Sequence, residues 1–360
     1  MFRAFLALLL NVAAFAQSSD ITELLQKQVL ANHLAGIAVI VVRADSVIAV
    51  AAVGVRHDGQ TTPIGSSDLF HLGSNTKAIT ATMIARVIQA GKLKWSTTPA
   101  DVFPELNDAD PALKRITVEQ LLSHYAGLPP YEDTSDKEFK TLPKFAGNAT
   151  EQRSQFTSWV LRHPPAVPPG TKPLYSNAGY AVAAAMAERV TGSTWEQLVT
   201  NEVLDPIGIH AAFAWPLAVG AGEPWGHTEN KKGVKPVDQS AKDSELPAYL
   251  LPAGGMAMTI ADYGKFLQAN LQALRSKDAL FTHLHTAPMR DKYALGWGAQ
   301  SIDGVPSSAH TGSAGSFYAV AAIQSAQNVG VAVLLNSDGS RSAATAAKVL
   351  KALLKQFAVQ

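Results

Sequence analysis

A serine and a lysine three positions apart open the segment with the most regular helical spacing in the chain. Ser74 and Lys77 stand at the start of residues 74–89, where apolar side chains recur at helical intervals. Residues three apart share a face of a helix, so the lysine amine can lie beside the serine oxygen. A serine hydroxyl becomes a nucleophile when a base takes its proton, and lysine is such a base when burial or a neighbouring cation lowers its pKa. Free N–H groups at a helix start also suit a developing oxyanion.

A second short motif, Tyr175-Ser176-Asn177, stands between a proline-rich segment and a predicted helix. A tyrosine beside a lysine can relay protons, and the Asn177 amide can orient either a substrate amide or the lysine.

A third motif, His310-Thr311-Gly312, is followed by Ser313 and falls on a predicted edge strand. Its histidine and threonine can hydrogen-bond a substrate carboxylate or carbonyl, and its glycine permits close approach of a ligand. Each motif is weak alone because short patterns occur by chance. Their order, and their expected places at a helix start, a loop and a strand, strengthen all three.

Strand signals at both ends of the chain and helical signals between them predict the elements that carry these motifs. The pattern predicts strands over 36–43, 47–55, 307–311, 316–324 and 329–336, and helices over 21–34, 74–89, 178–191, 260–271 and 343–357. We expect an α/β (α+β) fold: an antiparallel sheet built from both termini and flanked by helices, with an inserted mainly helical lobe. The expected lobes are about 17–72 with 250–360, and about 73–249, in one catalytic domain over 17–360.

Composition narrows the functional classes. The chain has 360 residues, of which 47% are hydrophobic, so it can bury a large core. Its formal net charge of +1 gives no strong field for nucleic acid. It has no cysteine, which excludes disulfides, thiolate nucleophiles and cysteine-ligated metal or iron–sulfur sites.

The first 16 residues are typical of a signal peptide. Arg3 precedes an apolar segment over 4–15, and Ala14-Phe15-Ala16 fits a cleavage site that would leave Gln17 as the new N-terminus. The apolar segment is short for a membrane span. We therefore expect an exported protein, periplasmic or extracellular, with no stable membrane span after cleavage.

Other candidate sites give weaker signals. His283-Leu284-His285 has no nearby cluster of metal ligands, so a surface loop is the favoured interpretation. There is no His-Glu-x-x-His segment and no Gly-x-Ser-x-Gly elbow. The sequence predicts no metal, no other cofactor and no nucleic-acid partner.

Taken together, the motifs resemble the serine β-lactamase and penicillin-binding-protein superfamily, in the branch with class C β-lactamases, D-alanyl-D-alanine carboxypeptidases and related esterases. The resemblance covers nearly the whole chain after the signal peptide. Its matching segments are residues 70–77, 121–129, 169–170, 175–180, 252–256, 293–297 and 310–312.

This resemblance implies a β-lactamase/transpeptidase-like fold and assigns roles to the motifs. It implies that Ser74 is acylated, that Lys77 and Tyr175 share the acid–base work, and that Asn177 holds the substrate or the lysine. It places His310, Thr311, Gly312 and Ser313 on the opposite wall, with the N–H groups of Ser74 and Ser313 as the oxyanion hole, and Tyr131 at the rim.

The third motif departs from class C β-lactamases, which usually carry Lys-Thr-Gly where this chain has His310. A largely neutral histidine attracts a β-lactam carboxylate less than lysine does. An exported serine acyl-hydrolase of carboxypeptidase or esterase type, acting on a small-molecule or peptide substrate, is the first interpretation. A class C-like β-lactamase is the second, and a non-catalytic penicillin-binding or sensor domain is the third.

Overall fold

A six-stranded antiparallel sheet contains strands from both ends of the chain, as predicted. The computed structural model describes residues 20–132, 137–240, 246–286 and 293–358. The strand order is β2-β1-β11-β10-β9-β8. The strands are β1 Gly36–Val42, β2 Val47–Gly54, β8 Gly298–Ile302, β9 Val305–Ser313, β10 Tyr318–Gln324 and β11 Val329–Leu335. The predicted signal peptide lies outside the described residues.

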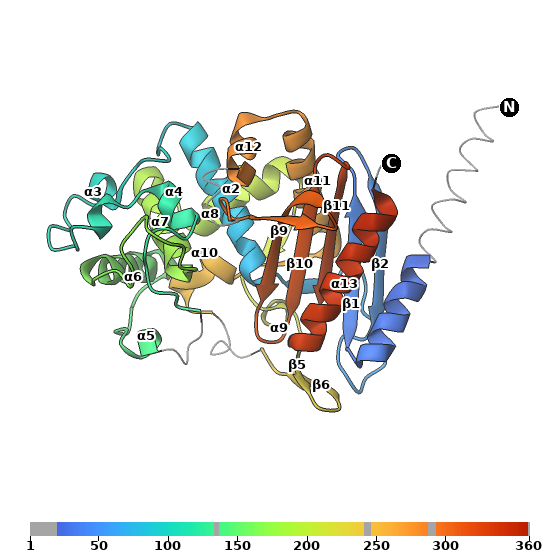
Figure 1. Cartoon of the computed structure of the whole chain (residues 1–360). Coiled ribbons are helices and arrows are strands. Elements are labelled where there is room, and N and C mark those ends of the chain that lie inside the picture. The colour runs from blue at the N-terminus through green and yellow to red at the C-terminus, as the bar shows by residue number, and fades with distance from the viewer. Residues whose placement is uncertain (1–19, 133–136, 241–245, 287–292, 359–360) are drawn as a thin grey trace.

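Helices cover both faces of this sheet. Every residue of β1 is buried, as expected for a central strand with two covered faces. Ile37, Val39 and Val41 pack against a helix over residues 20–32 and against α13 (Ser340–Phe357), and those two helices lie side by side in Figure 1. The alternate side chains of β1 face a second core with α11 (Ile260–Arg275).

The helical lobe follows β2 and precedes β8 in the sequence, lies to one side of the sheet and shares the second core with it (Figure 1). Its central helix α2 (Thr76–Gln89) is buried along most of its length and shares one core with α7 (Asn177–Thr191) and the sheet. The other helices are α3 Pro99–Val102, α4 Val118–Leu122, α5 Lys137–Lys140, α6 Ala149–Arg162, α8 Trp195–Val199, α9 Pro216–Val219, α10 Leu251–Gly254 and α12 Ala279–Thr286. Short strands β3 Leu69–His71, β4 Ala211–Ala212 and β7 Ala257–Thr259 form a second sheet, and β5 Gly226–Asn230 pairs with β6 Gly233–Val237.

The prediction that the third motif lies on an edge strand is wrong. The edge is formed by β8, a strand that the sequence did not predict and that pairs with β9. The segment of β8 has one large apolar residue, and only that residue is buried, so its composition gives little strand signal. However, the ladder between β8 and β9 ends at Ala309. Residues 310–313 of β9 therefore form no ladder pairs with β8. Their backbone groups on the β8 side are left for a substrate, as the third motif requires.

The predicted surface loop at His283 and His285 is also wrong, because both residues lie on helix α12. His285 is buried, and its Nε2 lies 3.0 Å from the Oδ1 atom of Asn270. The described part of the chain contains no group of three or more His, Asp or Glu side chains placed to hold a metal ion. It also contains no helix with the length and hydropathy that crossing a membrane requires.

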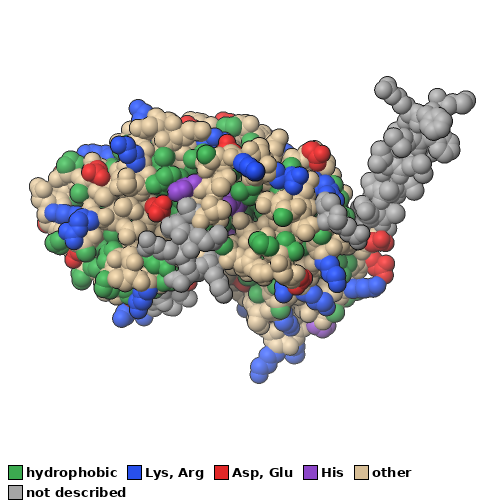
Figure 2. Space-filling view, turned by 45° about the horizontal axis from the view of Figure 1, so that its top comes forward, with side chains coloured by type: hydrophobic (Ala, Val, Ile, Leu, Met, Phe, Trp, Pro, Cys, Tyr) green, Lys and Arg blue, Asp and Glu red, His purple; other side chains and the backbone are tan. Residues whose placement is uncertain are grey.

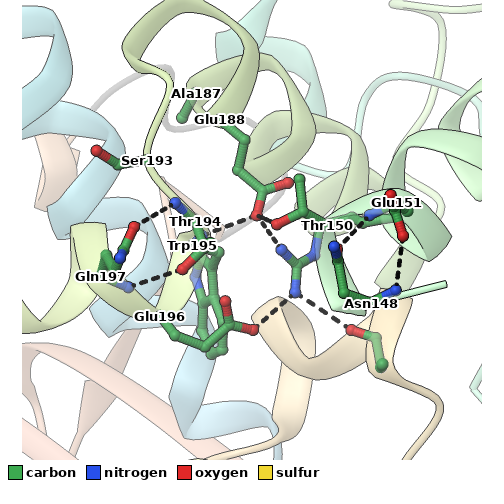
Figure 3. A network of polar contacts seen from close by, with 12 residues as sticks. Asn148, Thr150, Glu151, Ala187, Glu188, Ser193, Thr194, Trp195, Glu196 and Gln197 are labelled. Atoms are coloured by element: carbon green, nitrogen blue, oxygen red, sulfur yellow. Dashed lines mark hydrogen bonds and ion pairs between the residues drawn. The ribbon is translucent and has the colours of Figure 1, made fainter.

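A buried arginine, Arg153, joins three helices of the inserted lobe, and Figure 3 shows its partners Glu188 and Glu196 within the surrounding polar network. Arg153 on α6 pairs with Glu188 on α7, and its Nη2 lies 3.0 Å from the Oε1 atom of Glu196 on α8. The same nitrogen donates to the Ala248 carbonyl at 3.3 Å. Glu188 also accepts the N–H of Trp195 at 2.8 Å. The network therefore fixes the segment that leads into α10, which borders the site described below.

Replacing Arg153 by methionine is expected to lower the free energy of unfolding by about 3–5 kcal/mol, because it leaves the buried Glu188 carboxylate without its cation. Denaturant titration measures the loss. The matched control is Arg162→Met on the same helix, whose partner Asp108 is exposed; that change should cost less than about 1 kcal/mol. Equal losses in the two variants would contradict the role given to the network.

Candidate active site

Ser74 lies within hydrogen-bond distance of two groups that can carry protons. It occupies the 3-10 turn Gly73–Asn75, which leads directly into α2. Its Oγ atom lies 3.1 Å from the Nζ atom of Lys77 and 2.8 Å from the hydroxyl oxygen of Tyr175. The two motifs that are 101 residues apart in the chain therefore meet at one oxygen atom.

The buried amine of Lys77 is held so that it faces Ser74. Its Nζ donates to the Asn177 Oδ1 atom at 2.7 Å and to the Ala253 carbonyl at 2.8 Å. Burial lowers the pKa of Lys77 to about 7, although the negative charge of Glu132 opposes that shift. A neutral amine has two hydrogens and one lone pair. Since Asn177 Oδ1 and the carbonyl can only accept, they take both hydrogens of the neutral amine and leave its lone pair for the Ser74 hydroxyl, whereas the protonated amine donates its third hydrogen to Ser74 Oγ.

The Asn177 amide is engaged by the protein at both ends. While its oxygen accepts from Lys77, its Nδ2 donates to the Tyr131 carbonyl at 2.8 Å. Of the two roles open to Asn177 in the sequence, the geometry favours orienting the lysine. The Tyr131 ring is buried against Phe156 and Phe139, so its backbone, rather than a side chain at the rim, reaches the site.

Tyr175 is held as a neutral phenol. Burial raises its pKa above the ordinary value, and the charge of Glu132 adds to the effect. The Lys77 Nζ atom lies 4.6 Å from the centre of the Tyr175 ring, and the ring of His124 covers it at a centroid distance of 4.3 Å. A protonated hydroxyl beside Ser74 can donate to its oxygen or pass a proton to a leaving group.

Two glycines allow the third motif to approach the nucleophile. A Cβ atom on Gly312 would overlap the Leu72 carbonyl and stand 2.9 Å from the Ser74 nitrogen. Gly73 has φ +50°, and a Cβ there would stand 2.7 Å from the Ser313 carbonyl oxygen. Strand β9 and the Ser74 turn are therefore in backbone contact, as an oxyanion hole shared between Ser74 and Ser313 requires.

His310 is neutral and has one defined tautomer. Its Nδ1 lies 2.7 Å from the Thr311 carbonyl oxygen, which can only accept, so Nδ1 carries the hydrogen. Its Nε2 then accepts from the Tyr293 hydroxyl at 2.9 Å. Burial and the charge of Lys77 lower the pKa of His310 to about 3. The wall of the site at this residue carries no positive charge at neutral pH.

Four groups near the reacting atoms are absent from the predicted site: Glu132, His124, the Ala253 carbonyl and Tyr293. The last three fall within segments that carry the family resemblance, which is the available signal for them. Glu132 directly follows Tyr131 and belongs to no motif.

Histidine side chains reach the surface near the middle of the molecule in Figure 2, between the helical lobe and the sheet, and charges of both signs are scattered over that face.

A serine held by a lysine and a tyrosine, opposite a His-Thr-Gly strand, can be compared with known proteins. The sequence matches the family described as Beta-lactamase over residues 19–355. The chain belongs to the Beta-lactamase family. This confirms the resemblance drawn from the motifs and places the protein in a superfamily of serine hydrolases.

Relatives in the Beta-lactamase family have several names. The chain is 26% identical to penicillin-binding protein 4 of Amycolatopsis lactamdurans, over 86% of this chain and 82% of that protein. It is 26% identical to the unguisins hydrolase ungD of Aspergillus violaceofuscus, over 79% and 55% of the two chains. It is 27% identical to a β-lactamase of Escherichia coli, over 59% and 50%. The chain thus spans only about half the length of the last two.

Solved structures confirm the predicted fold class. The octameric penicillin-binding protein homologue from Pyrococcus abyssi matches with a TM-score of 0.74 at 20% identity, over 94% of this chain and 77% of that one. The structure of a protein named SurE matches with a TM-score of 0.73 at 22% identity, over 95% and 75%. At these identities the likeness describes the Beta-lactamase fold alone.

Proposed function

We propose that this protein is an exported serine hydrolase that transfers an acyl group to Ser74 and then to water. The observation that carries the proposal is the position of Ser74 Oγ, within 3.1 Å of the Lys77 amine and 2.8 Å of the Tyr175 hydroxyl. Membership of the Beta-lactamase family supports it. Export rests on the signal-like residues 1–16, and N-terminal sequencing of secreted protein that began at Met1 would remove that part of the proposal.

During acylation, Ser74, Lys77 and Tyr175 donate and accept the protons that move. Ser74 Oγ attacks the substrate carbonyl carbon while its proton moves to the lone pair of Lys77. The carbonyl oxygen becomes an oxyanion facing the N–H groups of Ser74 and Ser313. When the bond to the leaving group breaks, the Tyr175 hydroxyl donates its proton to that group, and the proton that Lys77 took from Ser74 replaces it. Water then attacks the acyl-serine, and the same groups act in reverse to restore Ser74.

An ester or a peptide is the substrate class that the site supports best. The neutral His310 removes a cation that would attract an anionic substrate. A carboxypeptidase-like or esterase-like reaction is our first assignment, and the missing cation favours the esterase, because a carboxypeptidase must bind a free C-terminal carboxylate. A β-lactamase reaction is the second, because relatives with that name share the family and the same nucleophile chemistry would open a lactam ring.

Intact-protein mass spectrometry tests the proposal. The mature protein is mixed with a p-nitrophenyl ester and, separately, with a penicillin, beside the Ser74→Ala variant. Ester turnover with a Ser74-dependent acyl adduct is the expected result. Rapid loss of penicillin without a lasting adduct would favour the β-lactamase, and a lasting adduct without turnover of either compound would favour a binding or sensor domain. Absence of any adduct and any turnover would overturn the proposal.

The pH dependence of the reaction should follow the titration of Lys77. Because its pKa is about 7 and only the neutral amine accepts a proton, kcat/KM should rise with pH through about 7 and level off above about 8. The charge of Glu132 raises the pKa of Lys77. Glu132→Gln should therefore move the midpoint to lower pH. Glu105→Gln, on an exposed carboxylate paired with Arg189, is the control and should not move it. A flat profile between pH 6 and 8 would contradict the role of Lys77.

A further inference from the structure

A carboxylate without a cationic partner among the described residues lies at the end of β9, beside the third motif. The Ser313 hydroxyl donates to the Oδ2 atom of Asp338, and the N–H of Gly315 donates to the same oxygen at 2.9 Å. Asp338 is half-buried, and Ser313 is exposed. The carboxylate therefore borders the open end of the turn that follows His310-Thr311-Gly312.

Backbone contacts tie the turn that holds this carboxylate to the segment that carries the nucleophile. The Ser313 carbonyl oxygen is packed against Gly73, the residue before Ser74. The Asp338 N–H donates to the His227 carbonyl at 2.9 Å, which ties the loop after β11 to strand β5. The position of the carboxylate is therefore set from two sides, by the turn after β9 and by the β5 strand.

A further hydrogen bond and an electrostatic effect connect Asp338 to its surroundings. Its carbonyl accepts the N–H of Glu229 at 3.2 Å, so β5 holds the residue on both sides of its backbone. Burial raises the pKa of Tyr318, whose side chain hydrogen-bonds to Thr311, and the charge of Asp338 adds to that shift. The field of the carboxylate thus reaches a side chain that contacts the third motif.

Within the described residues, no ion pair neutralises this charge. The next cation along the chain, Arg341, is turned toward the β5–β6 hairpin, where it pairs with Glu229 and donates to the Asn230 carbonyl at 3.0 Å. His310 is neutral because burial keeps its pKa at about 3. Among the ion pairs of the described residues, none involves Asp338. A substrate that lies along Thr311–Ser313 therefore meets a negative potential.

We propose that Asp338 is a specificity-determining residue that disfavours substrates carrying a carboxylate on the part that lies beside Thr311–Ser313, and so selects neutral or cationic esters and amides. The inference rests on the proposed function and narrows its substrate class. Like charges within about 8 Å at a partly solvated surface repel enough to change a rate constant about three- to tenfold. The selection acts against peptides that end in a free carboxylate at this wall and against β-lactams that carry a carboxylate.

Matched pairs of esters test the inference. One pair of aryl acetates carries a meta carboxamide or a meta carboxylate on the phenol, and a second pair carries the same two groups on the acyl chain. Each kcat/KM is divided by the rate constant for hydroxide hydrolysis of the same ester, at pH 8. In at least one pair, the wild-type protein should prefer the carboxamide by about three- to tenfold, and the preference should shrink as salt screens the charge.

Asp338→Asn should remove most of that preference. The hydrogen bonds from Ser313 and Gly315 end on one oxygen, which the amide can supply, so the turn can keep its shape. The control is Asp303→Asn at the opposite end of β9, where φ is +50° and asparagine is tolerated. It should leave the preference unchanged.

The outcomes separate the two proposals. Ser74-dependent turnover without a preference in either pair, or with a preference that Asp338→Asn leaves intact, would overturn the role of Asp338 alone. A preference that does not respond to salt would overturn it as well, and this measurement needs no variant to fold. Absence of any Ser74-dependent turnover would overturn the proposed function, and this inference with it.

Discussion

Ser74→Ala is expected to lower kcat/KM for an ester substrate by at least about 10⁴-fold, because it removes the atom that forms the acyl-enzyme. The substitution itself is small, because it removes only the side-chain oxygen atom. Ser74 is only partly buried, and alanine suits the start of a helix sequence well enough to keep the turn before α2. The unfolding transition should therefore stay near that of the wild type. Steady-state hydrolysis of a chromogenic ester measures the loss.

The matched control is Ser301→Ala, at an exposed serine on the edge strand β8. This variant should retain wild-type kcat/KM. Residual activity of more than about a hundredth in a purified Ser74→Ala sample would mean that another group attacks the substrate. In that case the Ser74 turn would be a structural feature, and the proposed function would lose its nucleophile.

Lys77→Ala is expected to lower kcat/KM by about 10³-fold or more, because the serine proton loses its acceptor. Tyr175 cannot replace the amine, since burial raises its pKa and keeps it protonated. The variant also leaves Asn177 Oδ1 and the Ala253 carbonyl without their shared donor. Single-turnover acylation followed by mass spectrometry separates the loss of acylation from any change in deacylation.

Two comparisons make the Lys77 result specific. Lys92→Ala, at an exposed lysine beyond the end of α2, should have no effect. A short primary amine added to Lys77→Ala should restore part of the rate if the cavity admits it, with a pH dependence set by the added amine. A variant that kept more than a tenth of the wild-type kcat/KM would show that Lys77 is not the base.

The local features of the molecule could be predicted because short-range physics decides them. The spacing of Ser74 and Lys77 puts both on one face wherever the segment is helical, and the segment is helical because its apolar residues recur at helical intervals. Gly192 ends α7 with φ +77°, and Thr259 caps α11, as their residue types indicate. Strand β1 could be predicted because its segment is a short run of apolar, mostly β-branched residues.

The missed features depend on contacts between distant segments. Strand β8 forms on the edge of the sheet although its residues give little strand signal, because pairing with β9 outweighs its weak propensity. Asp338 comes beside Ser313 only because β9, β10 and β11 pair in one register. Glu132 acts on Lys77 through space. No spacing along the chain signals such neighbours.

The pairing of β1 with β11 has a consequence for how the polypeptide acquires its site. Ile37 faces Leu335 in that ladder, and Ser74 meets β9 only when the same sheet has closed. Contacts between residues this far apart in the sequence require the long loop between them to close, which costs conformational entropy. Folds that depend on such contacts form slowly. A nascent chain that has emerged only as far as the helical lobe already contains its serine, lysine and tyrosine, yet lacks the wall opposite them. Reactivity therefore appears late, after the last strands have been synthesised and docked.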